Sequence, residues 1–346
     1  MTYCIDPLRD VRWEELCNTH PRSTVFHSVS WLNALKRTYA YEPACFTTSS
    51  SPESIANGLV FCVVSSWLTG QRLVSLPFSD HCDILTSNPE DAKELSLALI
   101  EHLKTTDAKY AEVRPIVPVP TAESQFQGTH EFFVHSLSLV PSVNDLFKSF
   151  HRDSIQRKIR RAEREGLRVE RGRSDELLRS FYHLLLITRK RHGVPPPPRN
   201  WFRNLIGCFG DCLAIRVAYH GTIAIAAVMT IKYKDALVYK YAGSDARFHS
   251  LGGMHILIWR AIQEAKLEGL RRLDFGRSDI DNHGLITFKD RWGTTREKIA
   301  YLRCTVRPVQ VGRTSVRSQR TARRVFNSMP ETVLSAAGRL LYRHVG

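Results

Sequence analysis

Hydrophobic and polar positions along the chain predict the same order of elements twice. Apolar runs bounded by turn residues predict strands, and apolar residues recurring every three or four positions predict helices. In the first half, these patterns predict strands at 58–66, 72–77 and 110–115 and a helix at 90–104. In the second half, they predict strands at 212–218, 222–232, 236–241 and 272–275 and a helix at 254–268.

The two halves therefore resemble two copies of one α/β module. The strands before and after each helix have nearly the same spacing, from Leu73 to Val113 and from Leu237 to Phe275. We expect each copy to be a mixed, mainly antiparallel sheet flanked by helices, at residues 1–145 and 146–309. The end of the chain, 310–346, is expected to pack back on the first module, and lying on a membrane surface is the alternative.

Further helices are predicted outside the repeat. One is expected at 145–164, before Gly166, and another at 175–192. Four consecutive prolines at 195–198 predict a stiff connector, because proline cannot continue a helix. A short helix is expected at 201–209. The last is expected at 330–345, with apolar residues along one stripe: Val333, Leu334, Ala337, Leu341 and Val345.

The positive charge of the chain is concentrated in two segments. The formal net charge is +15. Residues 303–346 hold nine arginines and one acid, and residues 151–173 hold nine basic residues and four acids. Such segments attract phosphate-rich partners, which include tRNA, nucleotide-linked substrates and anionic lipid. A solvated helix face and a soluble tail are the alternatives, and we expect no DNA partner.

The remaining composition is that of a globular protein. Hydrophobic residues make up 43% and charged residues 24%, and no apolar run approaches the length of a membrane span. The N-terminus lacks the basic and apolar regions of a secretory signal. Cys208 and Cys212 have no second ligand pair, so we expect no metal site. We expect a cytoplasmic protein without a tightly bound cofactor, and the inner face of the membrane stays open as its location.

Residues 237–298 combine a helix start with reactive side chains. A helix that begins at Gly252 and Gly253 beside a strand end offers free backbone N–H groups to an anion. The two glycines would let a phosphate or an acyl group approach closely, and a tight turn is the alternative. The loop after the next strand carries charged and polar groups that could hold an acyl donor and act on it: Arg277, Asp279, Asp281, His283 and Lys289.

Acyl transfer needs a cation for the oxyanion and a group that takes a proton from the attacking amine. Lys289 and Arg277 are candidates for the cation, and a surface lysine paired with Asp290 or Glu297 is the alternative. Candidates for the proton acceptor are Asp279, Asp281, His283 and Asp80, the last within the polar cluster 79–83. Roles as caps of turns are the alternative for these groups.

Two tyrosines are predicted to line an acceptor groove. Tyr239 and Tyr241 alternate along a strand, which would place both on one face of the sheet. A half-buried strand face without a ligand is the alternative.

Five stretches of the chain resemble the FemA/FemB-type peptidoglycan bridge-forming transferases and the related BioF2-like (CelD-type) GNAT acetyltransferase domain. They are FHSVSWL at 26–32, KIRRAEREGLRV at 158–169, YKYAGS at 239–244, DFGRS at 274–278 and GLITFKDRWG at 284–293. The last two form one fairly specific motif, because residue type, order and spacing agree together. The resemblance covers most of residues 20–305 and implies two tandem GNAT-like acyltransferase modules.

The resemblance also implies roles for particular residues. Lys289, in the pair with Phe288, is implied to stabilise the oxyanion, and Trp292 belongs to the same motif. Lys36 matches a lysine that meets a substrate phosphate in the N-terminal module. Family members that use aminoacyl-tRNA transfer an amino acid to an amine of a cell-wall precursor.

One departure from the GNAT pattern leaves the donor open. Acetyl-CoA enzymes carry Arg/Gln-x-x-Gly-x-Gly/Ala before the helix, and the same offsets here give His249, Gly252 and Met254. We expect an N-acyltransferase that moves an acyl or aminoacyl group, from acyl-CoA or aminoacyl-tRNA, to an amine of a cell-envelope or polysaccharide precursor. A CoA-dependent N-acetyltransferase of exopolysaccharide or lipid assembly is one alternative. A non-catalytic nucleic-acid or membrane-surface binding protein with the same fold is another. Among the partners of the enzyme we also expect a peripheral membrane contact through the basic C-terminus.

Overall fold

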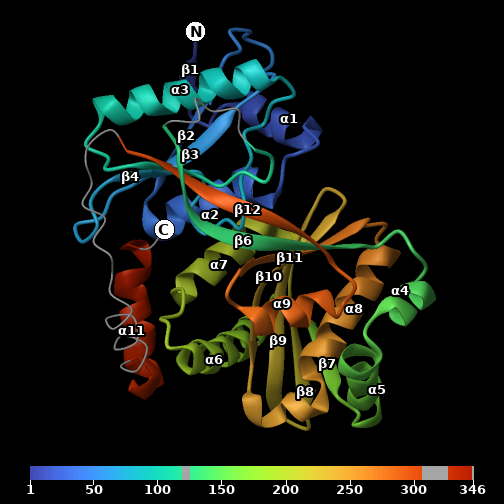
Figure 1. Cartoon of the computed structure of the whole chain (residues 1–346). Helices are drawn as coiled ribbons and strands as arrows, with labels where there is room; N and C mark the ends of the chain where they lie inside the picture. Colours follow the sequence, from blue (N-terminus) through green and yellow to red (C-terminus); the bar gives the residue numbers. More distant parts are fainter. Residues whose placement is uncertain (119–124, 306–325, 345–346) are drawn as a thin grey trace. The chain divides into compact units, whose positions relative to one another are not determined.

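The chain divides into two compact units (Figure 1). The structure is a computed structural model, and it describes residues 1–118, 125–305 and 326–344. Of these residues, the first unit holds 1–118, 125–133, 297–305 and 343–344, and the second holds 134–296 and 326–342. The chain passes between the units within β6 (Gln127–Ser138) and near the start of β12 (Thr295–Cys304). The module boundaries at 145 and 309 stay a prediction.

The first unit is an α/β module with the strand order β1-β2-β3-β4-β5-β12. Its other strands are β1 (Tyr3–Ile5), β2 (Glu42–Thr47), β3 (Leu59–Val64), β4 (Arg72–Val74) and β5 (Ala111–Val113). Its helices are α1 (Val11–Thr19), α2 (Val29–Tyr39) and α3 (Pro89–Thr105), with a 3-10 turn at Val25–His27. β4 and β5 are parallel, because α3 crosses over between them, and β5 is antiparallel to β12.

Helix α3 shows how the local sequence forms the module. Asn88 caps its start by accepting a hydrogen bond from the N–H of Glu90 at 3.0 Å, and Pro89 occupies the first turn. The apolar positions Leu95, Leu99 and Leu103 recur every fourth residue and are buried in one core with strand residues such as Phe61. The helix therefore covers one face of the sheet of the first unit.

The second unit has the strand order β6-β11-β10-β9-β8-β7. Its other strands are β7 (Arg168–Gly172), β8 (Leu213–His220), β9 (Ile223–Tyr233), β10 (Ala236–Ser244) and β11 (Arg272–Asp279). Its helices are α4 (Val143–Ser149), α5 (Arg157–Arg164), α6 (Asp175–His192), α7 (Arg199–Phe209), α8 (Gly253–Leu267), α9 (His283–Asp290) and α11 (Glu331–Leu341). Strands β7 to β10 run antiparallel, whereas β10 and β11 are parallel around α8.

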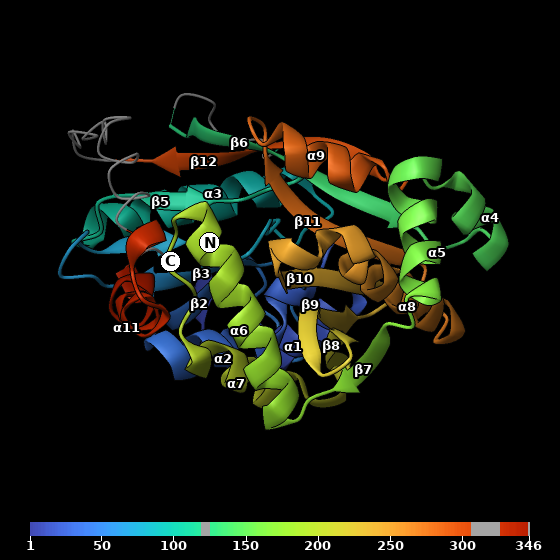
Figure 2. The same cartoon turned by 90° about the horizontal axis from the view of Figure 1, so that it is seen from below.

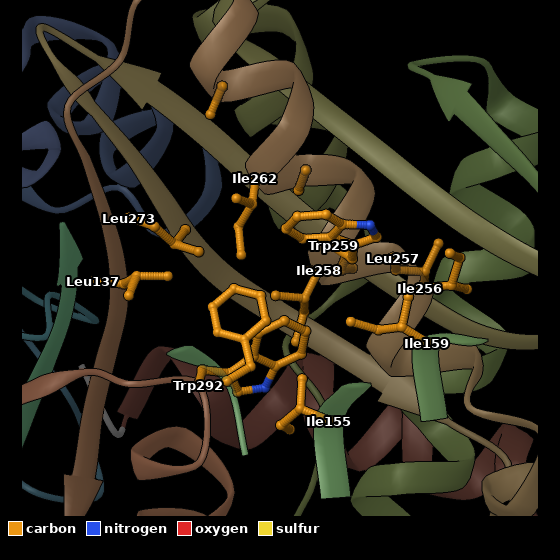
Figure 3. Close-up of a cluster of buried hydrophobic side chains, with 14 of the residues drawn as sticks. Leu137, Ile155, Ile159, Ile256, Leu257, Ile258, Trp259, Ile262, Leu273 and Trp292 are labelled. Atoms are coloured by element: carbon orange, nitrogen blue, oxygen red, sulfur yellow. The ribbon is translucent and has the colours of Figure 1, made fainter. Parts of the chain in front are cut away.

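Helices cover both faces of this sheet. On one face, α5 and α8 bury apolar side chains with strand residues in a core that includes Ile159, Trp259, Leu273 and Trp292 (Figure 3). On the other face, α6 lies along β8, β9 and β10 (Figure 2). There, a Cβ atom on Gly243 would lie 2.5 Å from the backbone of Leu184, so this glycine allows the close approach of α6 to β10.

The internal repeat predicted from the sequence is confirmed. In both units, a strand, a helix and a second, parallel strand follow in order, as β4-α3-β5 and β10-α8-β11. Leu73 pairs with Ala111 in the first unit, and Leu237 pairs with Leu273 in the second. The predicted fold class, two mixed and mainly antiparallel modules flanked by helices, is therefore correct.

The predicted continuous helix at 145–164 is wrong. The segment forms α4, a π-helical turn at Arg152–Gln156 and α5, and the backbone is extended at Phe150, with ψ 148°. The break buries the Phe150 ring between Trp259 and Trp292, with centroid distances of 5.7 and 5.0 Å. Burying this ring stabilises the break, because an aromatic side chain removes a large apolar area from water.

The last part of the chain contacts both units in turn. α11 packs on α6, and Gly338 lies so close to the carbonyl of Pro196 that a Cβ atom would be 2.3 Å from its oxygen. Leu334 is buried as predicted for the apolar stripe, but Val333 is 48% exposed, and Val345 lies outside the described residues. Arg343 and His344 contact the first unit, where the Arg343 carbonyl accepts a hydrogen bond from the Tyr41 hydroxyl at 2.7 Å.

Candidate active site

Strands β10 and β11 part beside the start of α8. Their parallel register covers three pairs, Ala236 to Val238 with Arg272 to Asp274, although β10 continues to Ser244 and β11 to Asp279. Two backbone features mark the parting: a bulge in β10 between Tyr239 and Tyr241 and a positive φ of 67° at Gly276 in β11. The ends of parallel strands and the start of the crossover helix thus meet here, as in many ligand sites of α/β proteins.

The start of α8 is electrostatically suited to an anion. Gly252 is its N-cap residue, no side chain in the described part of the chain caps the helix, and its first turn contains no acid. The Lys158 ammonium lies 3.2 Å from the Ser250 carbonyl, and the Arg191 guanidinium lies 3.4 Å from the His249 imidazole. These basic groups add to the partial positive charge of the helix N-terminus.

The space beside Gly252 is occupied by the protein itself. Its φ is 80°, and a Cβ atom there would lie 2.3 Å from the carbonyl oxygen of Lys158 in α5. The α5 backbone thus fills this face of Gly252, and the close approach of a phosphate or acyl group to Gly252 and Gly253 stays a prediction. Gly253 is tight as well, since a Cβ atom would lie 3.1 Å from Ala226 Cβ. Both glycines allow α8 to pack closely, and its N–H groups keep their direction along the helix axis.

Lys289 lies at the parting of the strands. It is 3% exposed, and its ammonium donates hydrogen bonds to the carbonyls of Gly276 at 3.0 Å and Arg277 at 2.8 Å. Asn282 caps α9 by accepting from the N–H of Leu285 at 3.1 Å, which fixes the helix that carries Lys289. The alternative of a surface lysine is therefore wrong, since the cation is buried against the end of β11.

Aromatic rings connect the motif of Lys289 to the start of α8. Trp292 is fully buried in the core drawn in Figure 3. Its ring lies 6.2 Å from Phe275, 6.5 Å from Phe288 and 6.2 Å from His255. Phe288 also meets the His255 ring edge-on at 5.8 Å. Trp292 and Phe288, predicted as substrate-binding residues, thus form the packed base that positions α9 against α8.

His255 is a functional candidate that the sequence pattern missed. It lies in the first turn of α8, and its buried Nδ1 has no hydrogen-bond partner within the described part of the chain. Burial, with the charges of Lys158 and His249, lowers the pKa of His255 to about 4, so the imidazole is neutral at pH 7. A single histidine between the apolar residues Met254 and Ile256 gives no signal of this kind in the sequence.

Two more buried groups near Lys289 were also missed. His135 in β6 is fully buried, and its Nδ1 lies 3.5 Å from the Asp290 carboxylate and 3.4 Å from the Thr294 hydroxyl. Burial and the charge of Lys289 lower the pKa of His135 to about 4. In β11, the buried hydroxyl of Ser278 has no hydrogen-bond partner among residues 1–118, 125–305 and 326–344.

The prediction that Tyr239 and Tyr241 share a face is wrong. The bulge at Lys240 reverses the alternation of β10, so the two rings point to opposite sides of the sheet. Tyr239 packs into the core with α8, 5.8 Å from Phe275, and burial raises its pKa above the usual range. The Tyr241 hydroxyl instead accepts a hydrogen bond from the Trp201 indole at 2.8 Å.

The other predicted groups after β10 and β11 are nearer the surface. Arg277 is half-buried, and Asp279, Asp281 and His283 are exposed. Asp279 ends β11, and His283 begins α9, so the predicted loop is largely regular structure. Their catalytic roles stay predictions.

Predicted residues of the first unit are engaged in local contacts. The Lys36 ammonium pairs with Glu42 at 2.8 Å, and the Asp80 carbonyl accepts a hydrogen bond from the Tyr301 hydroxyl at 3.0 Å. Asp83 lines a hollow of about 420 Å³, but its carboxylate accepts hydrogen bonds from the N–H groups of Ile116 and Val117. The polar cluster 79–83 therefore has a structural part in holding loops, and the substrate roles of Lys36 and Asp80 stay predictions.

Among the described residues, no group of three or more His, Cys, Asp and Glu side chains could hold a metal ion. None of their helices combines the length and apolar character needed to cross a membrane.

Comparison with known proteins agrees with this geometry. Residues 149–289 match the model of the acetyltransferase (GNAT) domain family. The fold is similar to that of FemX, with a TM-score of 0.68 and 15% identity over 87% of this chain and 96% of FemX. It is also similar to the C-terminal domain of a putative lysylphosphatidylglycerol synthetase from Agrobacterium fabrum, with a TM-score of 0.55 and 12% identity over 95% and 97% of the two chains.

A third similar structure has two modules in one chain. It is a tandem GNAT protein from the clavulanic acid biosynthesis pathway, with a TM-score of 0.52 and 13% identity over 90% of this chain and 99% of that one. No curated protein matches the chain in sequence. At these identities the three structures show the fold, and the family match adds the class of enzyme. The fold is that of two tandem GNAT-like modules, and the match of residues 149–289 to the GNAT acetyltransferase domain indicates an acyltransferase.

Proposed function

We propose that the protein is an N-acyltransferase that moves an acyl or aminoacyl group to an amine of a cell-envelope or polysaccharide precursor. The observation that carries the proposal is the buried Lys289 ammonium at the point where β10 and β11 part beside the start of α8. A cation and a helix N-terminus at one place suit a donor with a phosphate and a carbonyl that becomes negatively charged.

In the proposed reaction, the neutral amine attacks the carbonyl carbon of the donor. A C–N bond forms, the carbonyl becomes a tetrahedral oxyanion, and the C–S bond of a thioester or the C–O bond of an ester then breaks. Lys289 stabilises the oxyanion, which is worth roughly 3–4 kcal/mol for one well-placed group. Its two backbone hydrogen bonds hold the ammonium in position before the charge develops.

The proton of the attacking amine needs an acceptor. His255 is neutral and its Nδ1 is available in the first turn of α8, so we propose that it takes the proton and passes it to the leaving thiolate or alkoxide. Asp279, Asp281 and His283 are exposed and could take this part only with an acceptor bound at the end of β11.

Two donors fit the basic start of α8. The family match favours acyl-CoA, because it is to an acetyltransferase domain, whereas the similarity to FemX and to a lysylphosphatidylglycerol synthetase favours an aminoacyl donor. His249 and Met254 stand where an acetyl-CoA enzyme has Arg/Gln and Gly/Ala, which also favours the aminoacyl donor. A CoA-dependent N-acetyltransferase is thus the second candidate, and the cytoplasmic location stays a prediction.

The test compares donors and a lysine variant in one assay. A pool of aminoacyl-tRNA and a panel of acyl-CoAs are each offered with a UDP-linked muropeptide and an amino sugar as acceptors. Lys289→Met is expected to lower kcat by about 10²- to 10³-fold with little change in KM for the donor. The matched control is Lys266→Met, because Lys266 also donates to a backbone carbonyl, that of Leu139, but near the other end of α8.

Salt separates the two donors. Binding of aminoacyl-tRNA should weaken steeply between 50 and 200 mM salt, by about 10³-fold if six or more phosphates are contacted, whereas acyl-CoA should respond weakly. Normal transfer by Lys289→Met would overturn its role in the oxyanion. Absence of transfer with every donor in the wild type would overturn the proposed acceptor class.

A further inference from the structure

The turn between β3 and β4 displays two apolar side chains to solvent. Trp67 is 85% exposed and Leu68 is 55% exposed at the tip of this hairpin. The other five tryptophans of the chain, all within the described residues, are buried: Trp13, Trp31, Trp201, Trp259 and Trp292. Exposing the largest apolar side chain at a tip is unfavourable unless the tip has a binding partner.

The backbone of this tip satisfies its own hydrogen bonds. The Ser66 hydroxyl accepts from the N–H groups of Leu68 at 3.2 Å and Thr69 at 2.9 Å, and the Ser66 carbonyl accepts from Gly70 at 2.7 Å. Gly70 has φ 82°, which closes the turn. A turn whose N–H groups are already paired can enter a medium poor in water without leaving those donors unsatisfied.

The end of the chain fixes the tip on the first unit. The Arg72 guanidinium donates to the His344 carbonyl at 2.8 Å, and the His344 imidazole lies 2.8 Å from the Ser66 hydroxyl. The His344 ring also meets the Trp67 ring edge-on at a centroid distance of 5.4 Å. Trp67 is therefore presented from a hydrogen-bonded base, which reduces the ordering needed when it binds.

Cations flank the tip. The side chain of the exposed Lys109 lies against Gly70, its N–H donates to the Gln71 carbonyl at 2.8 Å, and Arg343 next to His344 is exposed. Residues 65–72 contain no acid, and Asp107 is the acidic residue next to Lys109 along the chain. The surface around Trp67 is thus complementary to a negatively charged partner.

The size of the tip favours a bilayer over a protein as that partner. A stable protein interface buries about 800 Å² on each side, more than one tryptophan and one leucine can supply. A bilayer needs no complementary pocket, and tryptophan prefers the interface between headgroups and acyl chains. We propose that the β3–β4 tip inserts Trp67 and Leu68 into the interface of an anionic phospholipid bilayer, with Lys109 and Arg343 against its headgroups.

This inference does not rest on the proposed transfer reaction, and the fluorescence of Trp67 tests it directly. The full chain is mixed with vesicles of phosphatidylglycerol and phosphatidylcholine, and with vesicles of phosphatidylcholine alone. Anionic vesicles are expected to shift the emission to shorter wavelength and to protect the exposed fraction from acrylamide. Because the other tryptophans are buried, the change should disappear in Trp67→Ala.

Vesicle co-sedimentation measures the binding itself. Trp67→Ala is expected to lower the partition coefficient about tenfold, and Leu68→Ser by a few-fold. Lys109→Gln should weaken binding to anionic vesicles, with less effect at high salt. The control is Leu267→Ser, since Leu267 is 88% exposed at the end of α8 in the second unit and should have no effect.

Three outcomes would overturn the inference. They are equal partitioning of Trp67→Ala and the wild type, an emission spectrum that vesicles leave unchanged, and an emission shift that appears with protein concentration alone. The last outcome would show that the tip meets a second copy of the chain.

Discussion

The two parallel crossovers of the molecule, β4-α3-β5 and β10-α8-β11, share a topology and differ at the ends of their strands. In the first unit, the ends of β4 and β5 are closed by a buried cation: the Arg114 guanidinium donates to the Leu76 carbonyl at 2.7 Å and to Glu112 at 2.9 Å. In the second unit, β10 and β11 part, and Lys289 holds the end of β11.

The starts of the two crossover helices differ as well, because the start of α3 is capped and acidic and that of α8 is not. In α3, the Asn88 side chain accepts a hydrogen bond from an N–H group of the first turn. Glu90 and Asp91 in the same turn would repel an anion. α8 has neither a side-chain cap nor an acid in its first turn. The comparison teaches that the strand ends and the helix start of such a module can be closed by side chains or left parted and uncapped without a change in topology.

Arg114→Met should give the largest effect and tests whether the first module is structural. Among the ion pairs of the described residues, the change leaves the buried Glu112 with Arg303 at 2.7 Å, and it also removes a donor to the Leu76 carbonyl. Loss of one partner of a buried pair costs about 3–5 kcal/mol, which urea denaturation would measure. Transfer activity per folded molecule should not change, and a specific loss of kcat would break the comparison.

A double variant controls for the Glu112 charge that Arg114→Met leaves without this partner. Burial alone would raise the pKa of Glu112, but the charges of Arg114 and Arg303 outweigh burial and lower it. Adding Glu112→Gln removes the stranded carboxylate, so the double variant should recover part of the lost stability.

Gly252→Ala should give the next largest effect and tests the packing of α5 on α8. The new Cβ atom would lie 2.3 Å from the Lys158 carbonyl oxygen at a φ of 80°. We expect a loss of about 2–3 kcal/mol in a thermal or urea melt and weaker donor binding. Gly269→Ala is the matched control, because its φ is 77° and no atom of the described residues lies within 4 Å of its Cβ position, so it reports backbone strain alone.

Helix α8 and the crossovers could be predicted from the sequence, because apolar spacing and turn glycines are local signals. The bulge at Lys240 could not be predicted, because an inserted residue is recognised only from strand pairing. The register between β10 and β9 shifts between Tyr239 and Tyr241. Lys289 was found through its motif, but its contacts depend on the positive φ of Gly276. His255 was missed because its unpaired Nδ1 is a property of packing rather than of sequence.

Acidification should destabilise both units, with a smaller effect for each histidine than that of Gly252→Ala. Burial is the main cause that lowers the pKa of His27 in the first unit and of His135 and His255 in the second from 6.5 to about 4. The unfolded chain then binds more protons between pH 6.5 and 4, so stability falls as the pH falls through that window. Each histidine should contribute about 1 kcal/mol of loss between pH 7 and 5.5.

Urea denaturation at the two pH values checks this dependence. His255→Gln should show a shallower loss than the wild type, and an equally steep loss would contradict the buried, neutral imidazole. The matched control is His130→Gln, because His130 is exposed in the first unit.

Asn88→Ala should give the smallest effect and tests the sealed start of α3. Loss of the hydrogen bond to the Glu90 N–H should cost about 1 kcal/mol in a thermal melt. Asn88→Asp keeps an acceptor and should stay near the wild type. Transfer activity should be the same in all three proteins, and a loss of activity in Asn88→Ala would place a ligand at α3 as well.

The path of the chain between the units limits how the enzyme can be divided. β6 leads from the first unit to the second, β12 returns to pair Leu302 with Val113, and the last residues reach Ser66 and Arg72. A gene fragment that encodes residues 146–309 alone would carry β12 away from β5. Recombination or truncation must therefore keep both modules in one chain. After a single protease cut within β6, the two pieces would still be joined through the pairing of β12 with β5.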